Sequence, residues 1–247
     1  IIFFVSSCEA TNITLVNTGT SDYEIAFLGS ATEHSSQSAE ILQNYLQEIA
    51  GVKINIVDES SQSAKADKIY VGNVSDENLK EQEINIKTEN KNLVIAGGSD
   101  EALRHAIYEF LERYLDCKWY APNVEDIPSL KSITLPLNID YKYNPEIKTR
   151  TVHSRLFYEN HDFADKHKVT YEAFPFYVPK GKVHTFHRFL PEEKFYKSNP
   201  DYFALRGNKR LPTQLCLTNK KVLEIVKDSV KAMFQRYPES SVISVSS

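Results

Sequence analysis

The sequence predicts an α/β protein built from two successive parts, and three features of the chain support this prediction. In residues 11–142, short apolar runs of strand type alternate with two segments of helical periodicity. In residues 143–247, strand-like runs, polar loops and one clear helix follow each other as they do at the start of a parallel (β/α)8 barrel. Four prolines punctuate the stretch between the two patterns, namely Pro122, Pro128, Pro136 and Pro145.

The first part begins with two strand-like runs and a helix. Residues 13–16 and 23–28 are apolar and are separated by turn-forming residues. Apolar residues then recur at helical spacing over residues 39–49, and Gly51 is placed to end that helix. Further strands are predicted at residues 52–57, 68–72, 83–87 and 92–96, the last two flanking a hairpin turn at residues 89–91.

A second helix follows the Gly97-Gly98 pair, with Ser99 or Asp100 as its N-terminal cap. Its buried face is predicted to consist of Leu103, Ile107, Phe110, Leu111 and Tyr114. The glycine pair lacks the spacing of the phosphate-binding loops GxGxxG and GxxxxGK[ST]. Close packing of helix against strand is therefore the preferred interpretation of the two glycines.

The second part carries four further strand candidates, at residues 147–152, 182–186, 214–217 and 241–245. Pro191 and the acidic residues after it are typical of a helix start. Thr218 or Asn219 is expected to cap a longer helix. The residues of that helix predicted to face inward are Val222, Ile225, Val226, Val230 and Phe234.

Residues 1–10 resemble the end of a signal peptide followed by a lipid-anchor tether. The apolar run at residues 1–5 precedes Ser6, Ser7 and Cys8, and an apolar stretch with small residues before a cysteine resembles the bacterial lipobox. Cys8 would then carry the lipid, and the protein would reside in the bacterial cell envelope, as a periplasmic or outer-membrane lipoprotein. The alternative is a short buried strand that contains a cysteine. No other segment approaches the ~20 apolar residues of a membrane span.

Composition excludes several classes of partner. A net charge of −4 provides no basic field for nucleic acid, and no lysine run suggests an anionic membrane surface. Cys117 and Cys216 lie in apolar surroundings, which predicts buried thiols. Two cysteines are too few for a disulfide framework and lack metal-ligand spacing, and a disulfide between them is the alternative to two free thiols. Apolar neighbours should also raise the thiol pKa, which disfavours Cys216 as a nucleophile. We therefore expect no metal and no cofactor.

Polar residues near predicted strand ends define the candidate site. In a βα barrel the working residues follow the C-terminal ends of the strands. Guanidinium groups bind carboxylates or phosphates, and imidazole and amide groups can bind sugar hydroxyls. The pattern predicts a binding wall for a hydroxyl-rich ligand, with acidic ligands among the options. The predicted site residues are His184, Arg210, Gln214, Asn219, Arg150 and His153.

His184 and Arg210 also have interpretations other than sugar binding. His184 and His187 could share a metal if they were on a helix, but their neighbours look extended, which would splay the rings. Arg210 lies beside the turn Gly207-Asn208 and could belong to a solvated loop.

Two motifs resemble a known family. Residues 102–122, ALRHAIYEFLERYLDCKWYAP, resemble the end of the small domain that precedes the barrel in bacterial α-glucuronidases and β-hexosaminidases. Residues 196–205 and 214–219 resemble an uncharacterised family of bacterial lipoproteins related to those α-glucuronidases and associated with polysaccharide use. The resemblance covers residues 20–247. It implies a hexosaminidase-like α/β sandwich domain at residues 11–142, followed at residues 143–247 by the first strands and helices of a TIM-type (β/α)8 barrel.

The resemblance implies a glycoside hydrolase-like protein acting on complex polysaccharides, with uronate-containing ones among the options. This chain departs from the α-glucuronidases at residues 150–155, where RTVHSR replaces a tryptophan-containing motif, and this argues against glucuronic acid as the substrate. No catalytic residue is carried over, because none of the positions present matches a catalytic motif. Glycoside hydrolysis usually needs two carboxylates, and nothing marks Glu159, Asp162 or Asp165 as such a pair. The catalytic acids are thus expected beyond residue 247. The alternatives are a non-catalytic glycan-binding surface lipoprotein and a metal-dependent esterase or peptidase.

Overall fold

The computed structural model describes residues 11–28, 32–57, 67–72, 79–170 and 176–247. The chain divides into two compact units, residues 1–171 and residues 172–247, and we describe each by itself. This division falls later than the boundary after residue 142 that the prolines suggested. The predicted tether at residues 1–10, with Cys8, lies outside the described residues.

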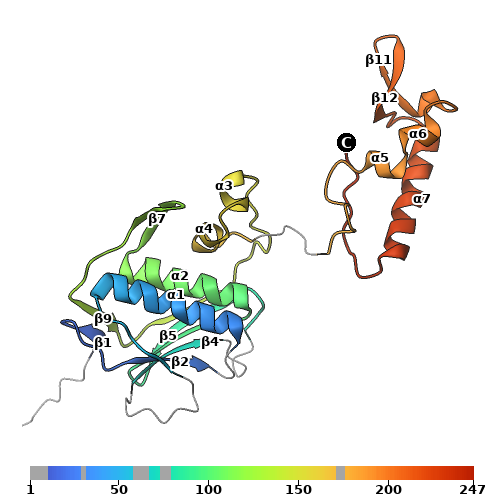
Figure 1. Cartoon of the computed structure of the whole chain (residues 1–247). Coiled ribbons are helices and arrows are strands. Elements are labelled where there is room, and N and C mark those ends of the chain that lie inside the picture. Colours follow the sequence, from blue (N-terminus) through green and yellow to red (C-terminus); the bar gives the residue numbers. More distant parts are fainter. Residues whose placement is uncertain (1–10, 29–31, 58–66, 73–78, 171–175) are drawn as a thin grey trace, which may run out of the picture. The chain divides into compact units, whose positions relative to one another are not determined.

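The first unit is an α/β structure around a mixed sheet, which confirms the predicted class of this part of the chain (Figure 1). Strands β2, β3, β4 and β6 run parallel, and β5 and β10 run antiparallel to their neighbours. In spatial order the strands are β10 (Asp140–Tyr143), β5 (Ile84–Glu89), β6 (Asn92–Gly97), β4 (Lys68–Gly72), β2 (Glu24–Leu28) and β3 (Ile56–Val57).

Helices α1 (Glu33–Ala50) and α2 (Asp100–Leu115) lie side by side on one face of this sheet (Figure 1). Thr32 caps α1 and Ser99 caps α2, each by accepting a backbone N–H bond with its hydroxyl. Gly51 ends α1 in the left-handed conformation, as its position predicted. The expected apolar stripe of α2 is buried, with Tyr114 packed at its margin.

The Gly97-Gly98 pair serves close packing, as predicted. A Cβ atom added to Gly97 would lie 2.2 Å from the backbone nitrogen of Leu103. One added to Gly98 would lie 1.9 Å from the carbonyl oxygen of Lys80. Only hydrogen fits at these two positions, so β6 can pass directly into the first turn of α2.

Two strand predictions in the first unit have different outcomes. The β5–β6 hairpin is confirmed, and both turn residues, Asn90 and Lys91, adopt positive φ as a tight hairpin turn requires. The strand predicted at residues 52–57 is only partly correct, because β3 contains only its last two residues. The Gln43 side chain donates to the carbonyl of Ile54 at 2.6 Å, so this segment bonds to α1 instead of extending the ladder.

The remaining elements of the first unit form small ladders and two short helices. β1 (Asn12–Asn17) pairs with β9 (Ser132–Pro136), and β7 (Lys118–Ala121) pairs with β8 (Val124–Asp126). Helices α3 (Arg155–Tyr158) and α4 (His161–Lys166) follow β10, and α4 packs against α2. The strand predicted at residues 147–152 is wrong. The Arg150 N–H donates to the Thr170 hydroxyl, and its guanidinium donates to the Lys168 carbonyl, in place of ladder bonds.

The pH dependence of this unit is expected to depend on His105, which is buried in α2. Burial, together with Arg150, Arg104 and Lys168, lowers the pKa of His105 to about 3. Its Nε2 lies 3.7 Å from Asp165 Oδ1, but the Asp165 carboxylate also accepts a 2.9 Å bond from Arg104. The unfolded chain binds a proton at this residue near pH 6.5 and the folded chain does not. The neutral state of buried His105 therefore costs the folded unit nothing above pH ~6.5. As the pH falls from there toward ~3, proton binding by the unfolded chain progressively lowers the unfolding free energy.

We expect His105→Leu to flatten this dependence. Between pH 6.5 and 4.5 the wild-type unit should lose about 2 kcal/mol of unfolding free energy that the variant retains. Urea unfolding followed by the fluorescence of Trp119, the single tryptophan and a buried residue of this unit, would measure the difference. If the unfolding free energy changed equally with pH in wild type and His105→Leu, His105 would not be the source of the pH dependence. The exposed His34→Leu serves as the matched control.

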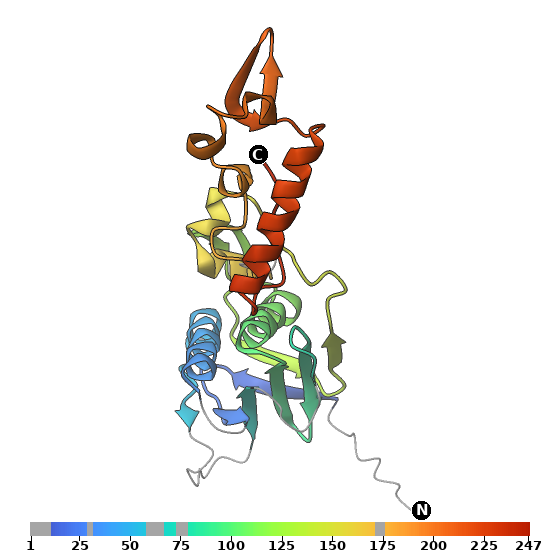
Figure 2. The same ribbon diagram turned by 90° about the vertical axis from the view of Figure 1, so that its right-hand side faces the viewer.

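The second unit consists of short helices, a hairpin and one long helix (Figure 2). A small core of Leu190, Phe203, Leu215 and Val222 joins these elements. Asn219 caps α7 with its side-chain oxygen, as predicted, but along the expected apolar face only Val222 is fully buried. The elements are α5 (Phe186–Phe189), α6 (Glu192–Phe195), the 3-10 helix η1 (Pro200–Tyr202), β11 (Phe203–Arg206), β12 (Lys209–Leu215) and α7 (Lys220–Arg236).

The strands predicted in the second unit are largely replaced by other structure. Residues 182–185 form no strand and lead into α5, and the strand predicted at residues 241–245 is reduced to one parallel bridge between Val242 and Tyr177. Residues 214 and 215 do belong to β12, which pairs antiparallel with β11. Among the described residues of this unit, parallel pairing is thus confined to that bridge. Residues 176–186 and 241–246 are joined by further backbone hydrogen bonds, such as Ser244 N–H to Gly181 O at 2.8 Å.

Candidate functional site

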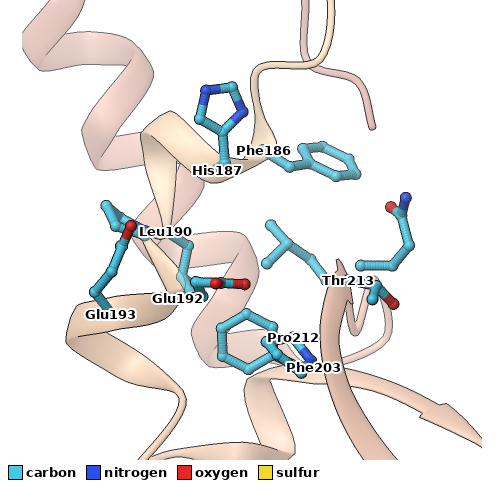
Figure 3. Close-up of a pocket in the computed structure, with 11 residues that line it drawn as sticks. Phe186, His187, Leu190, Glu192, Glu193, Phe203, Pro212 and Thr213 are labelled. Atoms are coloured by element: carbon cyan, nitrogen blue, oxygen red, sulfur yellow. The ribbon is translucent and has the colours of Figure 1, made fainter.

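The candidate site is a hollow of about 510 Å³ within the second unit (Figure 3). Its apolar lining comes from the same side chains that form the small core, so the hollow is built directly onto that core. Polar groups of four chemical types surround this apolar part: carboxylate, imidazole, hydroxyl and amide. The lining includes Phe186, Leu190, Phe203 and Leu215 on the apolar side, and His187, Glu192, Glu193, Thr213 and Gln214 on the polar side.

Pro191 and two hydrogen bonds position the elements that line the hollow. Pro191 is extended and separates α5 from α6, so the two short helices form a corner instead of one continuous helix. The Tyr196 hydroxyl donates to the Arg210 carbonyl at 2.7 Å, which ties the end of α6 to β12. The Arg210 guanidinium in turn donates to the Phe203 carbonyl at 2.8 Å and braces the hairpin.

The hollow has an acidic lining. Glu192 and Glu193 are both exposed, and the Glu192 carboxylate points toward the middle of the lining residues whereas Glu193 lies to one side (Figure 3). The described lining residues include no lysine or arginine, and His187 is the group that could add positive charge. Carboxylates accept hydrogen bonds from hydroxyl groups and repel anions. The polar side of this hollow therefore offers hydrogen-bond acceptors and carries negative charge.

Of the six predicted site residues, Gln214 lines the hollow. Arg210 and Asn219 lie in the same unit but make structural bonds. The Asn219 side chain accepts from the N–H groups of Lys221 and Val222, and donates to Asp201. His184 is exposed, has a φ of 53°, and places Nδ1 2.6 Å from the carbonyl oxygen of Ser247.

Arg150 and His153 belong to the first unit and are not among the residues that line this hollow. The Arg150 guanidinium donates to the carbonyls of Lys168 and Ile147 and to Gln82, which fixes it within its own loop. His153 is exposed and its Nδ1 shares a hydrogen bond with the Tyr158 hydroxyl. A ligand-binding role for these two residues remains a prediction from the sequence.

Metal binding by His184 and His187 finds no geometric support among the described residues. α5 begins at Phe186, so His184 precedes the helix and does not share a helical face with His187. Within the described part of the chain, no group of three or more His, Cys, Asp or Glu side chains is arranged to hold a metal ion. Likewise, no described helix is long and apolar enough to cross a membrane.

The carboxylates considered from sequence are engaged elsewhere. Glu159 pairs with Arg155, Asp162 with Lys166, and Asp165 with Arg104. Sequence reasoning missed Glu192 and Glu193 as site residues, because acids after a proline are typical of a helix start, which they also are. Their proximity to Gln214 is created by the α5–α6 corner and the hairpin together. No local pattern signals such a contact between distant segments.

The two described cysteines differ more than the sequence suggested. Cys117 is buried as predicted, and burial raises its pKa to about 12. Cys216 is only half-buried, so the prediction of a buried thiol is wrong for it. Its pKa is lowered, first by a hydrogen bond from Thr218 and further by Arg210, which outweigh desolvation. The expectation that apolar neighbours raise this pKa is therefore also wrong.

We expect iodoacetamide to alkylate Cys216 in the native protein at pH 8 while Cys117 stays unmodified, because the thiolate is the reactive form. Thr218→Val should slow the reaction at Cys216 several-fold by removing the main cause of the lowered pKa. Peptide mass spectrometry over time would measure both rates. Faster modification of Cys117 than of Cys216 would contradict this account.

Fold and site together define an α/β protein whose second unit contains a hollow with a partly polar lining. The model of the family described as Domain of unknown function (DUF4838) matches residues 119–247, and the chain belongs to this family. A comparison with curated proteins gives no match.

Solved structures similar to this chain include three glycoside hydrolases. A GH20 exo-β-N-acetylglucosaminidase from Vibrio harveyi is 15% identical with a TM-score of 0.41, over 66% of this chain and 22% of that one. A mutant Streptomyces plicatus β-hexosaminidase is 11% identical with a TM-score of 0.39, over 58% and 25%. A GH115 4-O-methyl-α-glucuronidase with specificity for decorated arabinogalactans is 12% identical with a TM-score of 0.47, over 91% and 41%. The chain thus spans less than half the length of each, and the similarity is distant.

Proposed function

We propose that the second unit binds a carbohydrate in the hollow between α5, α6 and β12. The observation that carries the proposal is the combination of an apolar floor with carboxylate, hydroxyl, amide and imidazole groups around it. A sugar ring offers the complementary surface, with C–H groups on its faces and hydroxyl groups at its edge. A volume of about 510 Å³ is within the range of small-molecule sites.

Each group has a defined part in this proposal. The half-buried Phe186 gives the ring an apolar surface, and the Gln214 amide can both donate to and accept from hydroxyl groups. Glu192 accepts from hydroxyls, and bonds to a charged acceptor are the stronger kind. Gln214 is the predicted residue that this proposal retains as a direct ligand-binding group.

We further propose that the whole protein is a glycoside hydrolase-like protein acting on complex polysaccharides, including uronate-containing ones. In this proposal the second unit contributes the start of a (β/α)8 barrel, with the parallel bridge Tyr177–Val242 as the first pairing of its sheet. Glu192 and Glu193 are consecutive in a helix and project ~100° apart, which suits binding better than opposition across a glycosidic bond. The catalytic carboxylates are therefore proposed to lie outside these residues.

Calorimetric titration with xylotetraose, cellotetraose and chitotetraose, all neutral probes, tests the binding proposal. At least one should bind, and Gln214→Ala or Glu192→Ala should each weaken that binding ~10-fold, as loss of one or two hydrogen bonds implies. Glu224→Gln, which changes an exposed acid on α7 outside the hollow, is the control. Binding that is unchanged in both hollow variants would contradict the proposal.

The rival function is non-catalytic glycan binding. A hydrolysis assay distinguishes this rival from a glycoside hydrolase. The complete protein should release new reducing ends from the probe that it binds. Binding without any release over a long incubation would favour the rival.

We also propose that Cys8 carries a lipid and anchors the protein in the bacterial cell envelope. The support is the apolar run and the small residues that precede this cysteine. Expression with an alkyne-tagged fatty acid should label the protein, and Cys8→Ser should abolish the label. Equal labelling of the two proteins would refute the anchor.

A further inference from the structure

A second hollow in the same unit is lined by basic side chains and meets the first at His187. It measures about 690 Å³, and His187 contributes to the walls of both hollows. Its other lining groups include Tyr177, Lys180, Lys182 and Arg188. None of these four was part of the site that the sequence predicted.

The two hollows have opposite charge. The described residues that line the second hollow include three cationic side chains and no carboxylate, whereas the first carries Glu192 and Glu193 and no lysine or arginine. Cations gathered in a concave surface raise the local concentration of anions. A ligand that spans His187 would thus meet acceptors for hydroxyl groups on one side and cations on the other.

The backbone around the second hollow is fixed by bonds to residues 241–246. Val178 N–H donates to the Val242 carbonyl at 2.9 Å, and Thr185 N–H donates to the Ser246 carbonyl at 2.9 Å. Lys180 adopts a positive φ of 59°, which is uncommon for a residue with a side chain. The backbone on both sides of the lysines is therefore bonded to residues 241–246.

Two of the three basic side chains, those of Arg188 and Lys182, make local contacts. Arg188 donates one guanidinium bond to the Pro179 carbonyl at 2.7 Å, and a guanidinium has five N–H groups in all. The Lys182 ammonium lies 5.8 Å from the centre of the Tyr177 ring, and this cation–π contact places it beside an aromatic face. A charged group bound here would have a ring surface next to it.

We propose that this second hollow binds an anionic substituent of a sugar, a carboxylate or a sulfate, next to the neutral sugar held in the first hollow. The proposal rests on the proposed function, because it extends the same binding surface across His187. It assigns Lys180, Lys182 and Arg188 as the groups that distinguish acidic from neutral glycans. The sequence had suggested Arg210 as a group that binds acidic ligands. In this proposal Lys180, Lys182 and Arg188 take that role.

The test compares three probes on the full chain by calorimetric titration: tetragalacturonate, the same tetrasaccharide with its carboxylates reduced to alcohols, and a sulfated neutral tetrasaccharide. We expect an acidic probe to bind at least 10-fold more tightly than the reduced one at low salt, with the preference shrinking as salt rises. Lys180→Gln combined with Lys182→Gln should remove the preference and leave the reduced probe unaffected. Arg188→Gln is a second, independent variant, and Lys231→Gln on α7 is the control.

The possible outcomes distinguish anion binding in the second hollow from neutral sugar binding in the first. An acid preference that is absent, or that survives in both variants, overturns the second hollow while neutral binding through Gln214 stands. An acid preference that depends on the lysines, without any neutral binding, supports the second hollow and overturns the first. The sulfated and carboxylated probes then identify which anion the lysines prefer, and a failure of both to bind overturns the inference.

Discussion

A Gly97→Ala variant is expected to lose the folded first unit, because the added Cβ would overlap the backbone of α2. The new Cβ would lie 2.2 Å from the nitrogen and 2.6 Å from the Cα of Leu103, and both atoms are backbone of α2. A flexible side chain could move aside, but here the helix itself would have to leave β6. We expect a cost above ~4 kcal/mol, which is exceptional for one methyl group.

Native-state hydrogen exchange of the amides in β6 and α2 would measure that loss, since these amides report on the first unit alone. Gly51→Ala provides the matched control, because its Cβ would meet no atom within 4 Å and only its φ of 71° opposes the change. The control should lose about 1 kcal/mol. Similar protection in Gly97→Ala and wild type would show that α2 is not seated on β6 as described.

Lys166→Met is expected to release α4 from the rest of the first unit. The Lys166 ammonium lies 2.8 Å from Glu125 Oε1 and 2.8 Å from Asp162 Oδ2, with the side chain only 8% exposed. Burial by itself would lower the pKa of Lys166, yet hydrogen bonds with Asp162, Glu125 and Tyr45 raise it overall. The lysine is thus charged, and its removal leaves two carboxylates near each other without their shared cation.

Removing one partner of a buried ion pair costs about 3–5 kcal/mol, and the exposure of Asp162 reduces our expectation to about 2–3 kcal/mol. Limited proteolysis should then cut the Lys166→Met chain between residues 143 and 170 faster than wild type. Lys142→Met removes an exposed lysine that lies 3.4 Å from Glu83, and it should change little. If both variants resist the protease equally, the network does not secure α4.

Local signals in the sequence predicted the first unit well. Alternating apolar runs, the Asn90-Lys91 turn and the Ser99 cap are all decided by residues close in sequence, and the structure confirms them. The predicted strand at residues 147–152 failed because distant partners decide its hydrogen bonds. Arg150 bonds to residues 168 and 170 and to Gln82, which no pattern within the segment could signal.

The candidate site was predictable only in part, for a related reason. Polar residues near strand ends pointed to the second unit and to Gln214, which does line the hollow. Arg210 and Asn219 have the right chemistry, but they brace the hairpin and cap α7. Glu192 enters the site because Pro191 turns the chain between two short helices. That corner and the hairpin are tertiary features, so their combination could not be read from either segment.

The central claim is that the hollow between α5, α6 and β12 binds a carbohydrate, and NMR mapping tests it most directly. Titration of the ¹⁵N-labelled protein with xylotetraose, cellotetraose or chitotetraose should shift the amide resonances of residues 186–193 and 212–215 most strongly. The same titration of Gln214→Ala should need ~10-fold more ligand for equal shifts. Shifts confined to other residues, or no shift with any of the three probes, would contradict the account.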